Sequence, residues 1–232
     1  YESDCYFLSC AISSDGKYLA ASSRDETIKI WDLKKIIKND QFVAIPDKAF
    51  LNALIEEGVD TNGDRLISHG EAALITYLDI SGSWDEGEPG EVEYMKGIEA
   101  FVNLDTLRCD YMQLTSLDLS NNTALKYLRC NENQLSSLDV SVCIALTELK
   151  CRLNQLSSMD VSVCKALTRL DCDFNRLSTL DLSNNIDLKQ AGLRFNPNLQ
   201  KVCVWTMPFP PEGVNISTEG SPDVFYTSDC SK

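Results

Sequence analysis

Residues 60–71 (DTNGDRLISHGE) are rich in oxygen ligands at a recognisable spacing. They fit D-x-[DN]-x-D-x-x-I-x-x-x-E, a spacing that wraps carboxylate, amide and carbonyl oxygens around one hard cation. The ligands expected from it are the side chains of Asp60, Asn62, Asp64, Ser68 and Glu71 and the backbone carbonyl of Leu66. The segment is therefore predicted to be a calcium-binding loop of the EF-hand type, with calcium as a possible structural ion.

One residue of this loop departs from the pattern. The sixth position is usually glycine because the backbone turns left-handed there, and here it is Arg65. Since only Asp60, Asp64 and Glu71 are acidic, the expected dissociation constant lies in the weak range, about 10⁻⁴–10⁻³ M. The alternative interpretation is an Asp/Asn-rich turn that binds no metal. Apolar residues at helical spacing in 46–57 and 68–78 predict a helix on each side of the loop.

A second set of candidate residues recurs along the chain and could contact a partner. Its members are Arg108, Tyr127, Arg129, Glu148, Lys150, Arg152, Arg169, Asp171, Asp173 and Arg194. Arg and Tyr are frequent at protein interfaces, and the cations of this set would form a basic stripe that docks an acidic or polar protein or glycan. Because acidic residues are interleaved with the basic ones, a solvated face of paired charges is an equal alternative.

These residues are positioned by a repeat of 21 residues. Four cysteines recur at this spacing, Cys109, Cys130, Cys151 and Cys172, and each repeat fits L-x-x-L-x-C-x-x-N-x-L. This pattern is a leucine-rich repeat with Cys at one apolar position. Alternation around the Cys predicts a short strand with Leu and Cys facing inward, and strands of successive repeats pair in parallel about 4.8 Å apart.

The asparagine of the pattern follows each strand. The asparagines are Asn133, Asn154, Asn175 and Asn196. A stacked, buried amide at this place can bond backbone groups of its own and the adjoining repeat. The expected fold class is an α/β-type solenoid: a right-handed leucine-rich-repeat superhelix with parallel strands, a helical N-terminal cap and a small N-terminal β-meander.

The ten cysteines have more than one explanation. The 21-residue spacing indicates a buried thiol ladder, and Cys143 and Cys164 form a second pair at that spacing. Cys203 and Cys230 are candidates for a disulfide that closes the Pro-rich tail, although spacing alone does not fix the pairing. The pairing of Cys5 and Cys10 stays open.

Residues 10–33 (CAISSDGKYLAASSRDETIKIWDL) differ in character from the repeats. Alternating apolar residues and a Ser-Asp-Gly turn predict a meander of three strands, 7–12, 18–22 and 27–31. The segment resembles one blade of a WD-repeat propeller, including the closing Trp31-Asp32. A propeller needs at least about four blades, so no propeller is predicted.

The expected organisation has four parts. Residues 1–35 form the WD-like meander, and residues 36–96 form the helix–loop–helix cap with an acidic insert at 84–93. Residues 97–205 form the leucine-rich repeats, and residues 206–232 form the C-terminal cap.

Composition narrows the possible functions. The formal net charge of −14 repels phosphate backbones and anionic lipid, and no apolar run reaches the ~20 residues of a membrane span. The one histidine, His69, lies in the loop without a second histidine for a nucleophilic site. No enzyme activity is therefore predicted. Because the chain begins at Tyr1, a mature product with its export signal removed is expected.

From Ile45 onward the sequence resembles the secreted leucine-rich-repeat proteins of gut Bacteroidetes. The resemblance rests on IPDKAFLNALIEEGVDTNGDRLISHGEA, the C-x-x-N-x-L-x-x-L-D-V-S repeat and the ending NPNLQKVCVW…FPPEGV…SPDVFYTSDC. It implies a secreted or surface-attached, non-catalytic module that binds a protein or glycan. Two alternatives stay open: an assembly protein that oligomerises through the N-terminal hairpins, and an intracellular scaffold with reduced cysteines. The ligand and the oligomeric state are not predicted.

Overall fold

The computed structural model describes residues 7–23, 26–32, 41–82, 91–221 and 224–230. Cys5 and most of the predicted acidic insert, residues 84–90, lie outside these ranges. The chain divides into two compact units, Tyr1–Val43 and Ala44–Lys232. Each unit is described by itself.

The N-terminal unit contains a three-stranded antiparallel sheet. Strands β1 (Phe7–Ile12), β2 (Tyr18–Ser23) and β3 (Ile28–Asp32) follow one another as a meander, within a residue of the predicted strands. The Ser13 hydroxyl accepts the backbone N–H groups of Lys17 and Tyr18, and Gly16 supplies the positive φ of 70° that this tight turn requires.

The second unit begins with two short helices, α2 (Lys48–Glu56) and α3 (His69–Leu74). Asp47 caps α2, and its second carboxylate oxygen accepts N–H groups of Glu93 and Tyr94, which ties the helix to the first turn of the solenoid. The predicted helix over 68–78 is too long. Its last residues belong to strand β4 (Tyr77–Asp79), because Leu78 points into the solenoid core in register with Leu107.

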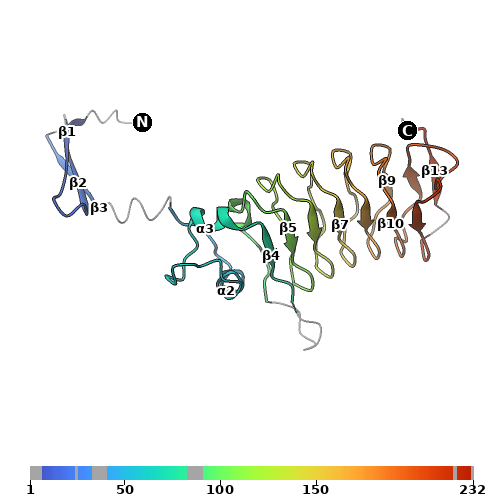
Figure 1. Ribbon diagram of the computed structural model, residues 1–232, viewed down its shortest axis with the longest axis horizontal. Helices are drawn as coiled ribbons and strands as arrows, with labels where there is room; N and C mark the ends of the chain where they lie inside the picture. Colours follow the sequence, from blue (N-terminus) through green and yellow to red (C-terminus); the bar gives the residue numbers. More distant parts are fainter. Residues whose placement is uncertain (1–6, 24–25, 33–40, 83–90, 222–223, 231–232) are drawn as a thin grey trace. The chain divides into compact units, whose positions relative to one another are not determined.

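The solenoid follows as a parallel sheet of seven strands (Figure 1). In spatial order these are β4, β5 (Thr106–Arg108), β6 (Tyr127–Arg129), β7 (Glu148–Lys150), β8 (Arg169–Asp171), β10 (Gln190–Gly192) and β12 (Asn215–Ser217). The sheet therefore extends beyond 97–205 at both ends. This confirms the predicted fold class, a leucine-rich-repeat solenoid, with its helices confined to the N-terminal side.

A smaller parallel sheet forms the opposite wall near the C-terminus. It contains β9 (Thr179–Asp181), β11 (Lys201–Cys203) and β13 (Phe225–Thr227). A 3₁₀ helix, η1 (Ile98–Ala100), precedes the first repeat. No helix in the described part of the chain has both the length and the apolar character that a bilayer crossing requires.

The core consists of stacked rows of leucine and cysteine. The central leucines of β5 to β8 and the four ladder cysteines are all at most 1% exposed. Each amide of the asparagine row lies beside them and satisfies backbone groups of two repeats. Asn154, for example, donates to the carbonyls of Cys130, Cys151 and Arg152 and accepts the N–H of Leu135. Because each amide spans two repeats, stacking rather than a single repeat stabilises the fold.

A second polar row is buried on the other side of the core. Asn122 and Asn185 are fully buried, and each side-chain amide donates to two carbonyls of the preceding repeat. Cys143 and Cys164 occupy the same place in the two repeats between them, where each thiol lies 3.6–3.9 Å from a carbonyl of the preceding repeat. Cys143 and Cys164 thus take the place that asparagine holds in the first and last repeats of this second polar row.

Each repeat also holds one non-glycine residue in the left-handed region. These residues are Tyr111, Glu132, Leu153, Phe174 and Phe195, with φ between 53° and 57°. Each lies three residues after the end of a strand, where the chain turns away from the sheet. A left-handed backbone costs an L-residue about 1–2 kcal/mol, so the packed repeats must offset this cost at each turn.

Candidate functional site

The strand face is the outer surface of the seven-stranded sheet, built from the side chains that point away from the core. Parallel pairing in register arranges these side chains in rows. The first row is Tyr77, Thr106, Tyr127, Glu148, Arg169, Gln190 and Asn215. The central row is Asp79, Arg108, Arg129, Lys150, Asp171, Gly192 and Ser217. The third row, just beyond the strands, is Ser81, Asp110, Asn131, Arg152, Asp173, Arg194 and Glu219.

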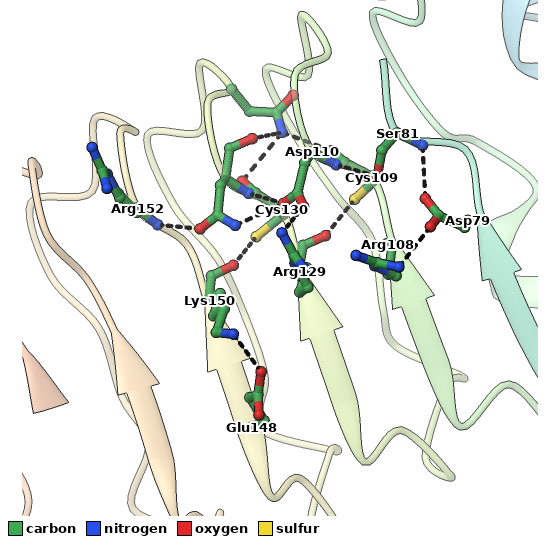
Figure 2. Close-up of polar contacts among 12 residues, drawn as sticks. Asp79, Ser81, Arg108, Cys109, Asp110, Arg129, Cys130, Glu148, Lys150 and Arg152 are labelled. Atoms are coloured by element: carbon green, nitrogen blue, oxygen red, sulfur yellow. Dashed lines mark hydrogen bonds and ion pairs between the residues drawn. The ribbon is translucent and has the colours of Figure 1, made fainter. Parts of the chain in front are cut away.

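Ion pairs between repeats neutralise much of this face (Figure 2). The Arg108 Nη1 atom lies 3.0 Å from Asp79 Oδ2, and Arg129 Nη2 lies 2.8 Å from Asp110 Oδ2. Lys150 Nζ lies 2.7 Å from Glu148 Oε1 within strand β7. The strand face is therefore close to electrically neutral on a strongly acidic protein.

The third row is organised by hydrogen bonds from side chain to backbone. A carboxylate oxygen of Asp110 accepts the backbone N–H of Asn131. The side-chain amide oxygen of Asn131, Oδ1, in turn accepts the backbone N–H of Arg152. Asp173 likewise accepts the Arg194 N–H. These bonds fix the side chains that make them, so the row is preorganised rather than free to rotate.

An aromatic pair borders the third row near its C-terminal end. The Phe174 and Phe195 rings are stacked with centroids 4.3 Å apart, and the Arg152 guanidinium lies 5.1 Å from the Phe174 centroid. The Phe195 side chain is 41% exposed. Stacked aromatic rings beside a guanidinium are the combination that protein interfaces use as anchors.

The structure brings all ten predicted partner-contact residues onto this one face. The sequence did not point to two residues in the central row of the strand face, Asp79 and Gly192. The 21-residue register of the central row could have found Gly192. It could not have found Asp79, which lies 29 residues before Arg108 instead of 21.

The loop at 60–71 has the left-handed turn of a calcium loop, and its last predicted ligand, Glu71, is held by hydrogen bonds. Arg65 takes the left-handed conformation, φ 62°, at the position where glycine is usual. Both oxygens of Glu71 are already occupied by donors: Oε1 accepts Thr61 N–H, Thr61 O–H and the Asn62 amide, and Oε2 accepts Ser68 N–H and O–H. These hydrogen bonds, chiefly the backbone N–H of Ser68, lower the pKa of Glu71 to about 2.

The three acidic residues among the predicted metal ligands, Asp60, Asp64 and Glu71, do not form a compact group. Over the described residues, the only group of three or more His, Cys, Asp or Glu ligand atoms within 4.8 Å of one another is Asp181, Cys203 and Cys230. Two members of that group, Cys203 and Cys230, are joined in a disulfide. Calcium binding at 60–71 therefore stays a prediction of the sequence.

Comparison with known proteins gives two kinds of likeness. Residues 3–32 match the family described as WD domain, G-beta repeat. No curated protein matches the sequence of the chain. Among solved structures, the solenoid is similar to the functional domain of InlJ from Listeria monocytogenes, which includes a cysteine ladder. The identity is 33% over 60% of this chain and 32% of that one, with a TM-score of 0.52.

An internalin, inlF of Listeria monocytogenes strain 4b F2365, is similar at the level of the fold. The identity is 18% over 76% of this chain and 57% of that one, with a TM-score of 0.50. The chain thus spans about a third of the first structure and just over half of the second. With the parallel sheet and stacked repeats, these likenesses establish the fold as a leucine-rich-repeat solenoid of the kind found in internalins.

Proposed function

We propose that the strand face binds a partner protein and that the chain is a non-catalytic recognition module. The leucine-rich-repeat fold supports a protein-interaction module in general. The observation that carries the proposal is the preorganised strand face, in which charged side chains are held by partners in neighbouring repeats. Rigid, paired charges favour specific docking because little side-chain entropy is lost on binding.

The charge distribution favours a protein over a nucleic acid. A net charge of −14 opposes polyanions, while the strand face carries interleaved charges of both signs. The half-exposed rings of Tyr127 and Phe195 add apolar contact area at this surface. A glycan ligand and an exported or surface location belong to the same proposal, and the family resemblance from Ile45 onward supports that location.

A binding screen against extracellular proteins and glycans tests this proposal. The full chain is immobilised beside a variant in which Arg129, Lys150 and Arg152 are changed together to Ala. The control changes three exposed lysines outside the strands of the face, Lys126, Lys165 and Lys189. Loss of capture in the first variant alone supports the proposal, and equal capture by all three proteins contradicts it.

A second candidate function is self-assembly through the N-terminal sheet. Ile28 and Ile30 are 71% and 68% exposed, and they lie opposite the small residues Ser22 and Ala20. A cavity of about 490 Å³ lies beside them with an almost wholly apolar lining that includes Ala20 and Ile30. Large side chains beside small ones form a surface that a second copy could complement.

Light scattering across a concentration series tests this candidate. The full chain should form oligomers that an Ile28→Lys/Ile30→Lys variant does not form. A wild-type chain that stays monomeric at 100 µM or about that concentration contradicts assembly through this sheet.

A further inference from the structure

A single glycine interrupts the row of long side chains at the centre of the strand face. In that row Gly192 of β10 lies between Asp171 of β8 and Ser217 of β12. A cavity of about 260 Å³ opens around Gly192. Its lining includes Asp171, Asp173, Arg169, Arg194, Lys150, Gln190 and Ser217.

Two carboxylates lean over this glycine. A β-carbon at position 192 would lie 2.9 Å from Asp171 Oδ1 and 2.8 Å from Asp173 Oδ1. Both oxygens therefore point at the same small volume. Gly192 itself is buried beneath these carboxylates, which leave no room for a side chain at position 192, and the cavity opens beside them.

The two carboxylates differ in how they are neutralised. Asp173 is held by Arg194, whose Nη2 and Nε atoms lie 2.6 Å and 2.7 Å from its Oδ2. Asp171 accepts one backbone N–H, from Asp173, and has no cation within 4.0 Å in the described ranges. Burial raises the pKa of Asp171 above its ordinary value, as expected for a carboxylate that lacks a full set of partners.

The cations of the lining already have other partners. Lys150 pairs with Glu148 at 2.7 Å, and Arg169 lies 3.7 Å from the second oxygen of the same carboxylate. Arg194 is engaged with Asp173. Asp171 therefore makes no ion pair within 4.0 Å in the described ranges, and Arg152 and Arg194 attract it only from a greater distance.

The same register position elsewhere in the sheet shows how such a carboxylate is satisfied. Asp79 of β4 faces Arg108 of β5 just as Asp171 of β8 faces Gly192 of β10. Arg108 places its Nη1 atom 3.0 Å from Asp79 Oδ2 (Figure 2). At Asp171 no side chain among the described residues places a cation at this distance.

We propose that this pocket receives the guanidinium or ammonium group of a basic side chain from a bound protein. The inference rests on the proposed function, since the side chain would belong to the protein that docks on the strand face. An arginine side chain fits best because its planar fork can bond two convergent carboxylates at once. A divalent metal is disfavoured, because the pocket offers only two carboxylates where calcium takes six to eight oxygen ligands.

The probe for this pocket is Nα-acetyl-L-arginine methylamide, added to the ¹⁵N-labelled full chain. Its control is the citrulline analogue, which has the same shape without the charge. Saturable shifts of the Gly192 and Asp173 amide signals are expected with the arginine compound alone. Asp171→Asn should weaken this binding about five- to tenfold, whereas Asp105→Asn, an exposed carboxylate outside the strand face, should leave it unchanged.

Equal shifts with citrulline, unchanged binding by Asp171→Asn, or displacement of the arginine compound by calcium chloride would overturn the proposal. Arginine binding without any captured protein would support the pocket and contradict the proposed function. Protein capture that is lost in the Arg129/Lys150/Arg152 variant but unaffected by Asp171→Asn would support the proposed function and contradict the pocket.

Discussion

Arg129 and Asp110 connect two consecutive repeats through a largely buried carboxylate. The Arg129 Nη2 atom lies 2.8 Å from Asp110 Oδ2, and the Asp110 side chain is 3% exposed. The other oxygen of Asp110 accepts both the backbone and the side-chain N–H of Asn131. This one carboxylate thus fixes two side chains of the next repeat.

Removal of this carboxylate should therefore destabilise the solenoid. Asp110→Ala is expected to lower the free energy of unfolding by about 2–4 kcal/mol, because it leaves a half-buried guanidinium and buried N–H groups without partners. Asp105→Ala, which breaks the exposed pair with Lys126 at 3.5 Å, should cost less than about 1 kcal/mol. Urea denaturation of the two variants measures the difference, and similar losses would contradict this account.

Replacing a buried cysteine by asparagine should have a small effect on stability at Cys143 and a large one at Cys130, because the two thiols lie in different rows of the core. Cys143→Asn should change stability by less than about 1 kcal/mol, because an amide there can donate to the carbonyls that Asn122 and Asn185 find in their own repeats. Cys130→Asn should cost about 2–4 kcal/mol, since it places an amide among leucines. Thermal melts and urea denaturation would test the contrast. If both variants lose equal stability, the interpretation of Cys143 as an asparagine replacement is wrong.

The ladder thiols should be unreactive in the folded protein. Burial raises the pKa of Cys109 and Cys130 well above the ordinary value, and raises those of Cys143 and Cys164 to about 11. A thiol-specific reagent at pH 8 should therefore modify the exposed Cys10 within minutes and the ladder only after denaturation. Peptide mapping by mass spectrometry identifies the modified cysteines, and Cys10→Ser provides the control.

Glu71 should make stability dependent on acidic pH. Its pKa is about 2 in the folded protein, below the ordinary value of 4.5. A depressed folded-state pKa contributes stability above the unfolded-state pKa, and that contribution is lost as pH falls from 4.5 towards 2. Between pH 5 and about pH 2.5, wild type should therefore lose more stability than Glu71→Gln. Parallel slopes of unfolding free energy against pH for the two proteins would contradict the prediction.

Calcium binding at 60–71 remains a prediction of the sequence, and the structure explains why it should be weak. To coordinate Glu71, the ion must displace five hydrogen-bond donors from its carboxylate. The bound loop must also keep Arg65 in the left-handed conformation. Isothermal titration should give a dissociation constant no tighter than about 10⁻⁴ M, and Arg65→Gly should tighten it several-fold by relieving backbone strain. A wild-type constant in the micromolar range or below would show that the loop rearranges more readily than its hydrogen bonds suggest.

The parts that the sequence predicts best are those with strict periodicity. Leu128, Cys130 and Asn133 recur every 21 residues, so inward direction, strand position and the stacked amide all follow from spacing. The helix expected over 68–78 failed at Tyr77 and Leu78, because their apolar spacing suits either a helix or a strand until the neighbour in β5 is known.

The site was only partly predictable for a related reason. Spacing placed Arg129 and Lys150 on one face, but it could not show which carboxylate each would pair with. Pairing depends on distances across strands, and Glu148 binds Lys150 within its own strand while Asp110 binds Arg129 from the preceding repeat. The pocket beside Gly192 was not predicted, because a search for chemically active side chains does not select a glycine.

The left-handed residues that lie just beyond strands β5 to β8 and β10 have a consequence for how this protein could change over time. A glycine at those five positions would be easier for the backbone, but it would offer nothing to a partner. With Tyr111, Glu132, Leu153, Phe174 and Phe195 there instead, each repeat displays one more side chain at a fixed height beside the strand face. Four residue types occupy these five positions, while φ stays between 53° and 57°. The solenoid thus holds a row of five positions where selection can vary recognition without altering the scaffold.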